Sequence, residues 1–408
     1  MSGERWWWTG KTAYQIYPKS FCDSNGDGIG DIQGIISRLD YLQWLGVDII
    51  WLSPIYQSPF VDQGYDISDY YRIADEFGTM EDFDRLLAEA KKRGIGVVMD
   101  LVVNHCSDRH EWFRQALADP DGKYGGYFYF VRGRNGRAPS NLRSYFGGSA
   151  WEPVPGTDLY YLHVFAKEQP DLNWENPSLR KEIYTMVNWW LDKGLAGFRI
   201  DAIMNIKKDT SFPDYPADGA DGLARPATMI HGAKGIGAFL SELKEKTFAP
   251  HKAFTVGEVF DLDESRVREF IGENGYFSTM FDFSTHLLFG GGEGGWYEER
   301  PYDFDAWRQT IIQSQLFVQQ CGLYYANVIE NHDEPRGASI YLPDWIKASE
   351  DTWLCGTKAL AAVLMLLRGI PFIYQGQELG MRNWQVQSVH DYNDLSTKDQ
   401  YQTALQAG

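Results

Sequence analysis

Eight short apolar segments, each bounded by turn residues, alternate with longer amphipathic stretches along this chain. The apolar segments lie at 12–18, 47–54, 96–105, 194–201, 253–260, 278–283, 325–333 and 370–376. Between them, helical patterns run over 35–46, 80–94 and 178–194, and glycines end the first two as helix C-caps would. This alternation is typical of βα units in a parallel sheet. Eight such units predict an α/β fold, a closed (β/α)8 TIM barrel.

One interval departs from the pattern. About seventy residues rich in glycine, proline and aromatic side chains separate the third apolar segment from the helix that begins near Ser178. This length predicts a small inserted domain after the third strand, at 105–175, with the catalytic barrel formed by 1–104 and 176–408. The third βα loop lies on the face where barrel enzymes keep their active sites, so the insert can wall off a pocket.

Charge and composition exclude some kinds of binding partner and cellular location. The formal net charge is -18 and the pI is about 4.9, which disfavours phosphate backbones and anionic membrane surfaces. The four cysteines are scattered without a C-x-x-C pair, so free thiols are expected. The first residues do not form a signal peptide, and the longest apolar run, at 359–367, is too short to cross a bilayer. These features predict a cytoplasmic monomer that binds neither nucleic acid nor membrane.

Four of the apolar segments end in a polar cluster: DLVVNH at 100–105, GFRID at 197–201, VGE at 256–258 and ENHD at 330–333. The carboxyl ends of parallel barrel strands converge on one rim. The residues expected to meet there are Asp201, Glu258 and Asp333, with Arg199, His105 and His332 beside them. A single acid at a strand end is most often the N-cap of the next helix. Three acids with an arginine and two histidines are not explained by capping, so the sequence predicts a catalytic site.

The chemistry of this set points to glycoside hydrolysis. That reaction requires one carboxyl that donates a proton to the leaving oxygen and an ionised one that faces the anomeric carbon. Converging carboxylates raise one another's pKa, so one can keep its proton near neutral pH. Arg199 lies two residues before Asp201 and is expected to keep it ionised as the nucleophile. Glu258 has no adjacent cation in the sequence and is the predicted proton donor.

These motifs resemble glycoside hydrolase family 13, the α-amylase family, and within it the oligo-1,6-glucosidase and α-glucosidase group. DLVVNH, GFRIDAIMN, VGEVF and ENHDEPR are similar to the first to fourth regions of that family, and QPDLN at 169–173 is similar to a segment of the group. The resemblance implies Asp201 as nucleophile, Glu258 as general acid/base and Asp333 as a carboxylate that orients sugar hydroxyls. It implies a hydrolase that releases glucose from the ends of short oligosaccharides and uses no organic cofactor.

The resemblance also implies a binding site for the terminal sugar. Its residues would be Tyr65, Asp66, His105, Phe165, Gln169, Arg199 and His332. Tyr65 would be a stacking platform and Asp66 a hydroxyl acceptor, although GYD at 64–66 alone would be read as a turn. For Phe165, core packing explains the residue equally well. Phe281 and Phe283 could flank the leaving group, with one of them in the core because alternate strand residues face opposite sides.

A metal loop is expected after the first strand. DSNGDGIGD at 23–31 has the oxygen-ligand spacing of an EF-hand loop up to its sharp turn, but Gly34 stands where the bidentate glutamate would be. A solvated turn explains most such matches. The resemblance nevertheless implies a structural Ca²⁺, or Mg²⁺, remote from the chemistry. Its ligands would be Asp23, Asn25, Asp27, the carbonyl of Ile29 and Asp31.

Several alternatives remain open. A transglycosylating or isomerising relative, such as a sucrose isomerase or trehalose synthase, would share the covalent intermediate. A catalytically silent assembly protein is disfavoured because all three acids are present. For linkage, valine after the nucleophile accompanies α-1,6 cleavage in the resembling group, whereas this chain has Ala202. The sequence therefore favours α-1,4 substrates such as maltose, with sucrose as a further candidate, over isomaltose, although one methyl-scale change is worth only about 1–3 kcal/mol.

The resemblance also implies further elements. In the family, a closing eighth helix, a hydroxyl-binding arginine and a C-terminal β-sandwich domain follow the eighth strand. The residues after 376 have no counterpart of them. The expectation is a barrel from which the C-terminal domain is absent.

Overall fold

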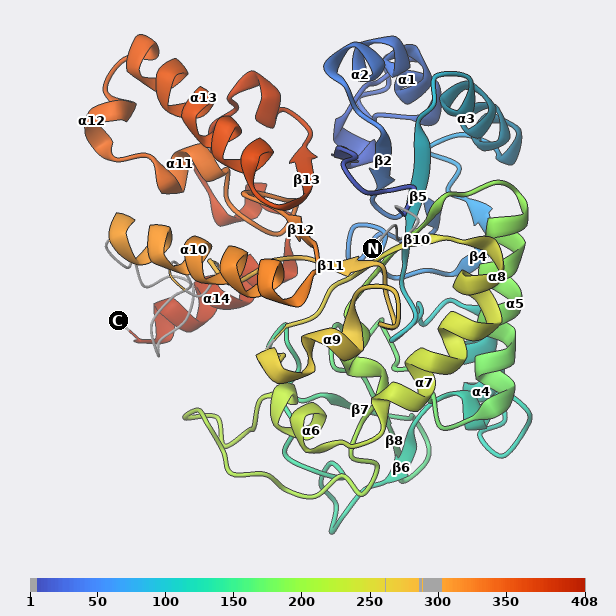
Figure 1. The fold of residues 1–408 in the computed structure, drawn as a ribbon. Coiled ribbons are helices and arrows are strands. Elements are labelled where there is room, and N and C mark those ends of the chain that lie inside the picture. Colours follow the sequence, from blue (N-terminus) through green and yellow to red (C-terminus); the bar gives the residue numbers. More distant parts are fainter. Residues whose placement is uncertain (1–5, 261, 286–287, 289–302, 408) are drawn as a thin grey trace.

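The barrel strands predicted from the sequence are all present. The computed structural model describes residues 6–260, 262–285, 288 and 303–407. Its main sheet has eight parallel strands in the order β11-β10-β9-β5-β2-β1-β13-β12. Their bounds are β1 Ala13–Ile16, β2 Ile49–Leu52, β5 Gly96–Leu101, β9 Gly197–Ile200, β10 Phe254–Gly257, β11 Thr279–Met280, β12 Tyr325–Asn327 and β13 Gly369–Tyr374. A parallel bridge between Phe281 and Ala326 joins the two edge strands, so the sheet forms a nearly closed barrel (Figure 1).

Helices pack around the outside of the barrel (Figure 1). They are α1 Ile32–Ser37, α2 Leu39–Leu45, α3 Met80–Lys92, α5 Pro177–Asp192, α7 Ile236–Leu243, α8 Ala249–His251, α9 Val267–Phe270, α10 Phe304–Cys321, α11 Gly337–Tyr341, α12 Asp344–Lys347 and α13 Glu350–Leu366. The helix α6 Pro226–Gly232 packs instead on the segment between β5 and α5. The predicted helix at 35–46 is in fact two helices, because the chain breaks at Arg38 (φ -106°, ψ 0°). Gly46 then ends α2 in the left-handed conformation, as predicted.

The inside of the barrel is filled by large apolar side chains. Trp51, Phe254, Phe281 and Phe372 pack there in one cluster with Trp8, which precedes the first strand. The Trp8 ring lies 5.7 Å from that of Phe254. Because this packing occupies the barrel core, polar side chains from several strands can gather only at the strand ends.

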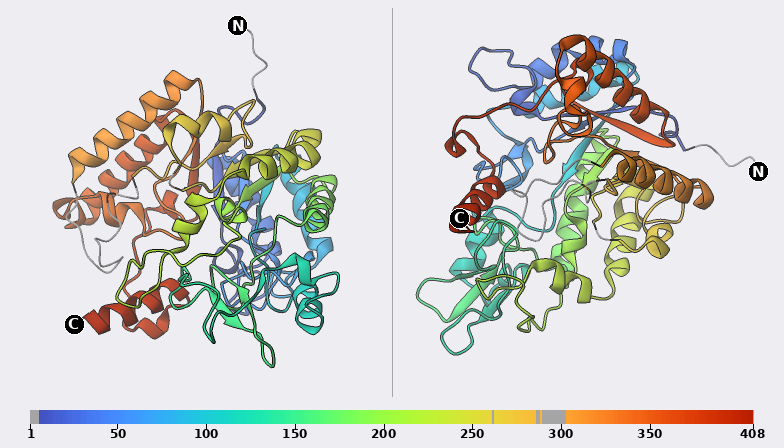
Figure 2. Two further views of the ribbon diagram at one scale, coloured as in Figure 1. Left: turned by 90° about the horizontal axis from the view of Figure 1, so that it is seen from below. Right: turned by 90° about the vertical axis from the view of Figure 1, so that its left-hand side faces the viewer.

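The segment between β5 and α5 carries its own small sheet. It contains α4 Glu111–Ala118 and three antiparallel strands in the order β6-β8-β7, at Phe130–Arg132, Leu159–Leu162 and Trp151–Pro153. An antiparallel bridge between His105 and Asp171 ties the end of this segment to its beginning. A further antiparallel pair, β3 Tyr56–Gln57 and β4 Asp69–Ile73, follows β2. The last helix, α14 Leu395–Ala407, returns to lie beside the inserted segment (Figure 2), where Asp399 approaches Gly147.

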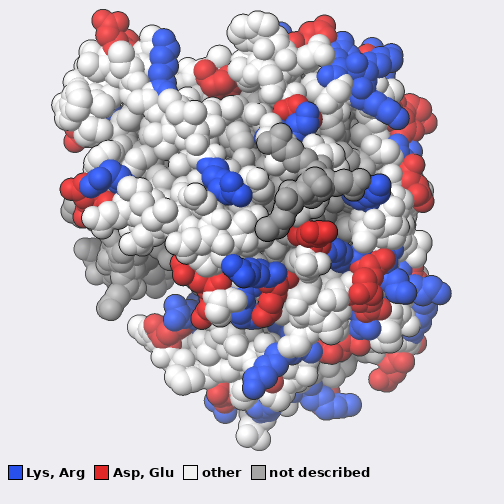
Figure 3. Space-filling view, in the orientation of Figure 1, with Lys and Arg blue, Asp and Glu red and all other residues white. Residues whose placement is uncertain are grey.

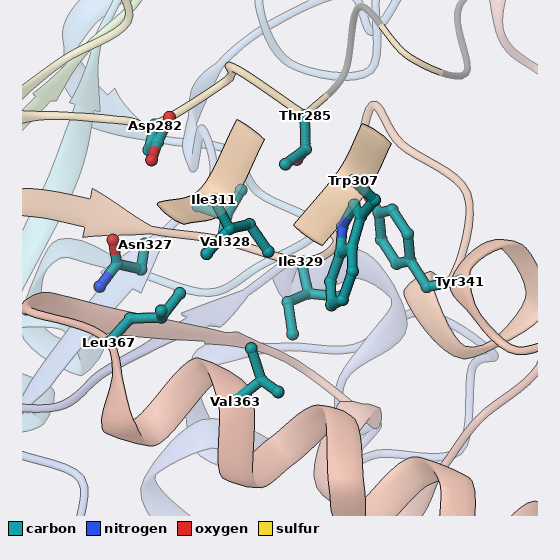
Figure 4. A pocket seen from close by; sticks show the side chains of 10 residues that line it. All are labelled: Asp282, Thr285, Trp307, Ile311, Asn327, Val328, Ile329, Tyr341, Val363 and Leu367. Carbon is teal, nitrogen blue, oxygen red and sulfur yellow. The ribbon is translucent and has the colours of Figure 1, made fainter. Parts of the chain in front are cut away.

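A separate cavity lies between β12 and the helices α10 and α13 (Figure 4). Its free volume of about 20 Å³ is room for about one water molecule. Asn327 lines it, and in the described part of the chain neither atom of its buried amide finds a protein partner. The size and polarity suit a single bound water, and the cavity is not part of the site described below.

Acidic and basic side chains are interspersed over the face in Figure 3, and neither sign forms a continuous field there. The area over α11, α12 and α13 carries fewer charges than the area over α5, α7 and α9. Within the ranges that the structure describes, no helix has the length and apolar character needed to cross a membrane.

Candidate active site

Arg199 is the centre of the polar cluster at the carboxyl ends of the strands. Its guanidinium is 2% exposed and donates from Nη1 to Asp100 Oδ1 and Asp201 Oδ1, both at 2.6 Å, and from Nη2 to Glu258 Oε1 at 2.5 Å. The three carboxylates come from β5, the end of β9 and the end of β10. These strands are neighbours, and Arg199 pairs in register with Asp100 on one side and Val256 on the other. The predicted convergence of Arg199, Asp201 and Glu258 is therefore observed.

The electrostatics of this cluster favour a shared proton. Burial raises the pKa of Asp201, and the carboxylates of Glu258 and Asp100 raise it further, whereas Arg199 opposes them. Burial also raises the pKa of Asp100, against the effect of Arg199. One guanidinium cannot neutralise three carboxylates, so protonation of one carboxyl relieves the repulsion. Such a cluster can provide one ionised and one protonated carboxyl side by side, as acid/base chemistry requires.

Glu258 does have a neighbouring cation, contrary to the expectation from the sequence. Arg199 contacts Glu258 as closely as it contacts Asp201, and the backbone N–H of Ala202 donates to the other oxygen, Glu258 Oε2, at 2.7 Å. The sequence concealed this contact because Arg199 and Glu258 are far apart in the chain. Adjacent parallel strands bring them together.

His332 joins the cluster from the loop after β12. Its Nε2 is 2.6 Å from the Tyr65 hydroxyl and 3.4 Å from Asp333 Oδ2. The Tyr65 ring stacks on the imidazole, with centroids 5.7 Å apart. Burial and the Arg199 charge lower the pKa of His332 to about 4, so the ring is neutral near pH 7. Asp333, whose side chain is 58% exposed, lies where it can reach a ligand.

The inserted segment contributes one wall. Gln169 is fully buried and its Nε2 lies 2.8 Å from Asp62 Oδ2 and 3.1 Å from His105 Nε2. The His105 ring packs against Phe165 at 5.0 Å between centroids, and the Tyr145 ring also packs on Phe165, at 5.1 Å. Burial lowers the pKa of His105 to about 3. The structure therefore places His105, Phe165 and Gln169 together.

Asp66 does not have the surroundings expected of a hydroxyl acceptor. Its carboxylate is fully buried and accepts hydrogen bonds from the Ser58 hydroxyl and from the backbone N–H groups of Val61 and Asp62, at 2.9–3.1 Å. These bonds hold the preceding loop at 58–62 in place, so the Asp66 carboxylate is occupied by its own loop.

Asp62 is the carboxylate that this loop presents instead. It accepts from Gln169, and burial raises its pKa to about 7, with Asp66 and Asp333 adding to the increase. The sequence does not single out Asp62, because the GYD motif at 64–66 points to Asp66 instead. The signal available was a second acid, in the fourth position before Asp66, within the same polar turn.

A buried ion pair fixes the inserted segment to the barrel. Lys208, in the loop after β9, lies 2.9 Å from Asp171 Oδ2, and neither side chain is exposed. Lys208 Nζ also donates to Asn104 Oδ1 at 2.9 Å. Removing one partner of such a pair would leave an uncompensated buried charge. The pair therefore holds QPDLN, with Gln169, in a fixed position against the end of β5.

Of the two phenylalanines after β11, Phe281 is in the core and Phe283 is half-buried against the same cluster; they are two residues apart, so strand alternation does not separate them. Phe281 is 2% exposed and packs on Trp51 and Phe372. Phe283 stacks in parallel on the half-exposed Phe260, with centroids 4.6 Å apart. Phe260 is two residues beyond Glu258 and Phe283 follows the neighbouring strand β11, so the stacked pair lies on the Glu258 side of the cluster.

Ala202 follows Asp201 in an unusual backbone conformation. Its φ of 42° and ψ of 35° are left-handed, a region that residues other than glycine rarely occupy. This turn directs its N–H to Glu258. Strain of this kind is concentrated at functional sites, and a β-branched side chain would increase it.

The loop at 23–31 offers oxygen atoms, but most of them already have partners. Asp23 accepts from the backbone N–H groups of Asn25, Gly26 and Gly28. Asp31 is buried and caps α1 by accepting from Gly34, while its other oxygen accepts from Ser24. Among the described residues, no three His, Cys, Asp or Glu side chains are grouped so as to hold a metal ion. The side-chain oxygens of Asp23, Asn25 and Asp27 and the Ile29 carbonyl are hard oxygen ligands of the kind that Ca²⁺ prefers. Asp31 is better explained as a helix cap.

Comparison with known proteins places the chain among sugar-processing enzymes. The family model of the α-amylase catalytic domain matches residues 15–407. A probable oligo-1,6-glucosidase of Bacillus subtilis is 46% identical over 407 residues, which cover 98% of this chain and 71% of the relative. A trehalose-6-phosphate hydrolase of Bacillus subtilis is 41% identical, with 98% and 70% covered. The structure of an isomaltulose synthase from Protaminobacter rubrum superposes with a TM-score of 0.90 at 38% identity and covers 100% of this chain and 71% of that one.

Proposed function

The chain belongs to the α-amylase family of glycoside hydrolases, and on that premise we propose that it is a retaining, exo-acting α-glucosidase for short oligosaccharides. The observation that carries the proposal is the Arg199 guanidinium that binds Asp201 and Glu258 at once, next to the neutral ring of His332. An acid, a nucleophile and hydroxyl-binding groups at one strand-end cluster are the requirements of a retaining glycosidase.

The mechanism we propose is a double displacement. Asp201 attacks the anomeric carbon and forms a glucosyl ester, while the bond to the leaving oxygen breaks and Glu258 gives that oxygen its proton. Glu258 then removes a proton from the water that cleaves the ester, and Asp201 is released as a carboxylate. Arg199 stabilises the ionised carboxylate at each stage.

We propose that the terminal glucose is bound by residues from both sides of the cluster. Tyr65 would stack on the sugar, and the hydroxyls would be bound by Asp62, Asp333 and the two histidines. The inserted segment, taken as 105–175, would close the site through Phe165 and Gln169 and so restrict cleavage to the chain end. The short oligosaccharide partner, the monomeric state and the cytoplasmic location stay predictions of the sequence.

Product analysis tests this function. Wild-type enzyme acting on maltotriose is expected to release single glucose units as the α-anomer, because two inversions retain the configuration. The anomer is read by proton NMR in the first minutes, before mutarotation. Initial release of β-glucose would overturn the retaining mechanism, and internal cleavage of long starch chains at comparable rates would overturn exo-action.

For linkage we propose a preference for α-1,4 bonds, supported by the small side chain of Ala202 beside the acid/base. The name of the Bacillus subtilis relative favours the second candidate, α-1,6 cleavage. Ala202→Val is expected to shift the ratio of kcat/KM for isomaltose over maltose towards isomaltose by about 10-fold. The left-handed backbone would also lower the stability of this variant.

Ala202→Gly is the matched control, because it removes the backbone strain without adding bulk. Its isomaltose-to-maltose ratio is expected to stay at the wild-type value. A wild type that prefers isomaltose, or a valine variant without a shift, would contradict the α-1,4 proposal.

We also propose that the loop at 23–31 binds Ca²⁺ through Asp23, Asn25, Asp27 and the Ile29 carbonyl. Calcium is expected to raise the melting temperature of the wild type by about 2 °C, and chelation is expected to reverse the rise, because a ligand stabilises the state that binds it. The double variant Asp23→Asn/Asp27→Asn should lose this response with kcat unchanged. Asp75→Asn, a change at an exposed acid elsewhere, should keep it. Equal calcium responses in the two variants would exclude the site.

A further inference from the structure

Gln15 is a buried polar residue on β1 that takes no part in the proposed double displacement. It is 1% exposed, and its Nε2 lies 2.9 Å from Nδ1 of His332 and 3.2 Å from the Ser53 hydroxyl. Gln15 lies on β1 and His332 follows β12, and these two strands flank β13, so the sheet brings the two residues together. An amide nitrogen can only donate, so a ring nitrogen that faces it must accept.

The other ring nitrogen has the opposite surroundings. His332 Nε2 faces the Tyr65 hydroxyl at 2.6 Å and Asp333 Oδ2 at 3.4 Å. A carboxylate only accepts, so it favours a hydrogen on Nε2. The contacts at Nδ1 and those at Nε2 therefore favour, independently, the same neutral tautomer, which carries its hydrogen on Nε2.

We propose that Gln15 is a positioning residue that fixes His332 as the neutral Nε2–H tautomer, whose hydrogen points towards the sugar side of the site. This inference rests on the proposed function, in which His332 donates to a sugar hydroxyl. The donor is fixed before substrate binds, so no proton has to be moved when the hydroxyl arrives.

The charges around the imidazole explain why a neutral donor is used. Arg199 on β9 lies close enough to disfavour a second positive charge, whereas Asp100 on β5, Glu258 directly after β10 and Asp333 favour one. Tyr17, Tyr65 and Trp51 enclose the ring and exclude water from it. A protonated ring would compete with Arg199 for Asp100 and Glu258. A neutral donor at Nδ1, such as Gln15, avoids that competition.

Two substitutions separate positioning from packing. Gln15→Glu keeps the shape but places an acceptor opposite Nδ1, which draws the hydrogen to Nδ1 or protonates the ring. We expect kcat/KM on 4-nitrophenyl α-glucoside to fall by about 100-fold and the acid limb of its pH profile to move to higher pH. Gln15→Met removes the hydrogen bond without reversing it, so we expect a loss of about 10-fold with the acid limb unmoved.

NMR of the enzyme labelled with ¹⁵N-histidine reads the tautomer directly, without substrate. The chain has eight histidines, and the His332→Asn variant assigns the signal. We expect a pyridine-type Nδ1 and a pyrrole-type Nε2 in the wild type, and the reverse pattern or a doubly protonated ring in Gln15→Glu.

Each outcome decides the inference. A wild-type ring with its hydrogen on Nδ1 overturns it, even if neither variant folds. Parallel losses of activity and melting temperature in both variants, with no pH shift in Gln15→Glu, also overturn it, because they indicate packing alone. If the wild type shows the expected tautomer but hydrolyses no α-glucoside, the proposed function fails and the assignment of Gln15 stands.

Discussion

Replacing Asp201 with asparagine is expected to lower kcat for maltose and for 4-nitrophenyl α-glucoside by about 10⁴-fold or more. An amide can neither attack the anomeric carbon nor leave from it, so both halves of the reaction are lost. The loss should be the same for poor and good leaving groups. The Arg199 contact at 2.6 Å would be weakened but not abolished, since the amide oxygen still accepts.

Asp209→Asn is the control for Asp201→Asn, because Asp209 lies further along the same loop and is engaged with Ser211 rather than with Arg199. Its kcat is expected to stay within about twofold of the wild type, as for surface changes in general. Retention of near-wild-type hydrolysis by purified Asp201→Asn, with contaminating glucosidase excluded by a covalent inactivator, would refute the nucleophile assignment.

Glu258→Gln is expected to give a different kinetic pattern. For maltose, whose leaving oxygen needs a proton, kcat should fall by about 10³-fold. For α-glucosyl fluoride, whose leaving group needs none, the first step should be much less affected and the glucosyl ester should accumulate. Azide, which attacks without a general base, should then restore turnover and form a glucosyl azide.

The contrast between the two variants separates their roles. Azide should not rescue Asp201→Asn, because no ester forms. If Glu258→Gln lost activity on the fluoride as completely as on maltose, or if azide had no effect, Glu258 would have a binding or structural role rather than that of acid/base.

The sequence determined the architecture and the identity of the main chemical groups. Eight apolar segments separated by helical patterns were enough for the barrel, because apolar periodicity reports which side of each element is buried. Asp201 and Glu258 could be assigned to one site because the carboxyl ends of all strands in a parallel barrel lie on one rim, whatever the details of packing. Gly46 after α2 was likewise a local signal, read from one residue.

Only the tertiary structure decided which partner each side chain has. The contact of Arg199 with Glu258, and that of Gln15 with His332, depend on strand order and register, which bring together residues that are distant in the chain. Asp62 rather than Asp66 is available to a sugar hydroxyl because the Asp66 carboxylate accepts hydrogen bonds from the backbone N–H groups of its own loop, whereas Asp62 accepts from Gln169. Composition and spacing fix where polar groups gather, but hydrogen bonds act over about 3 Å, and positions that precise exist only once the barrel has closed.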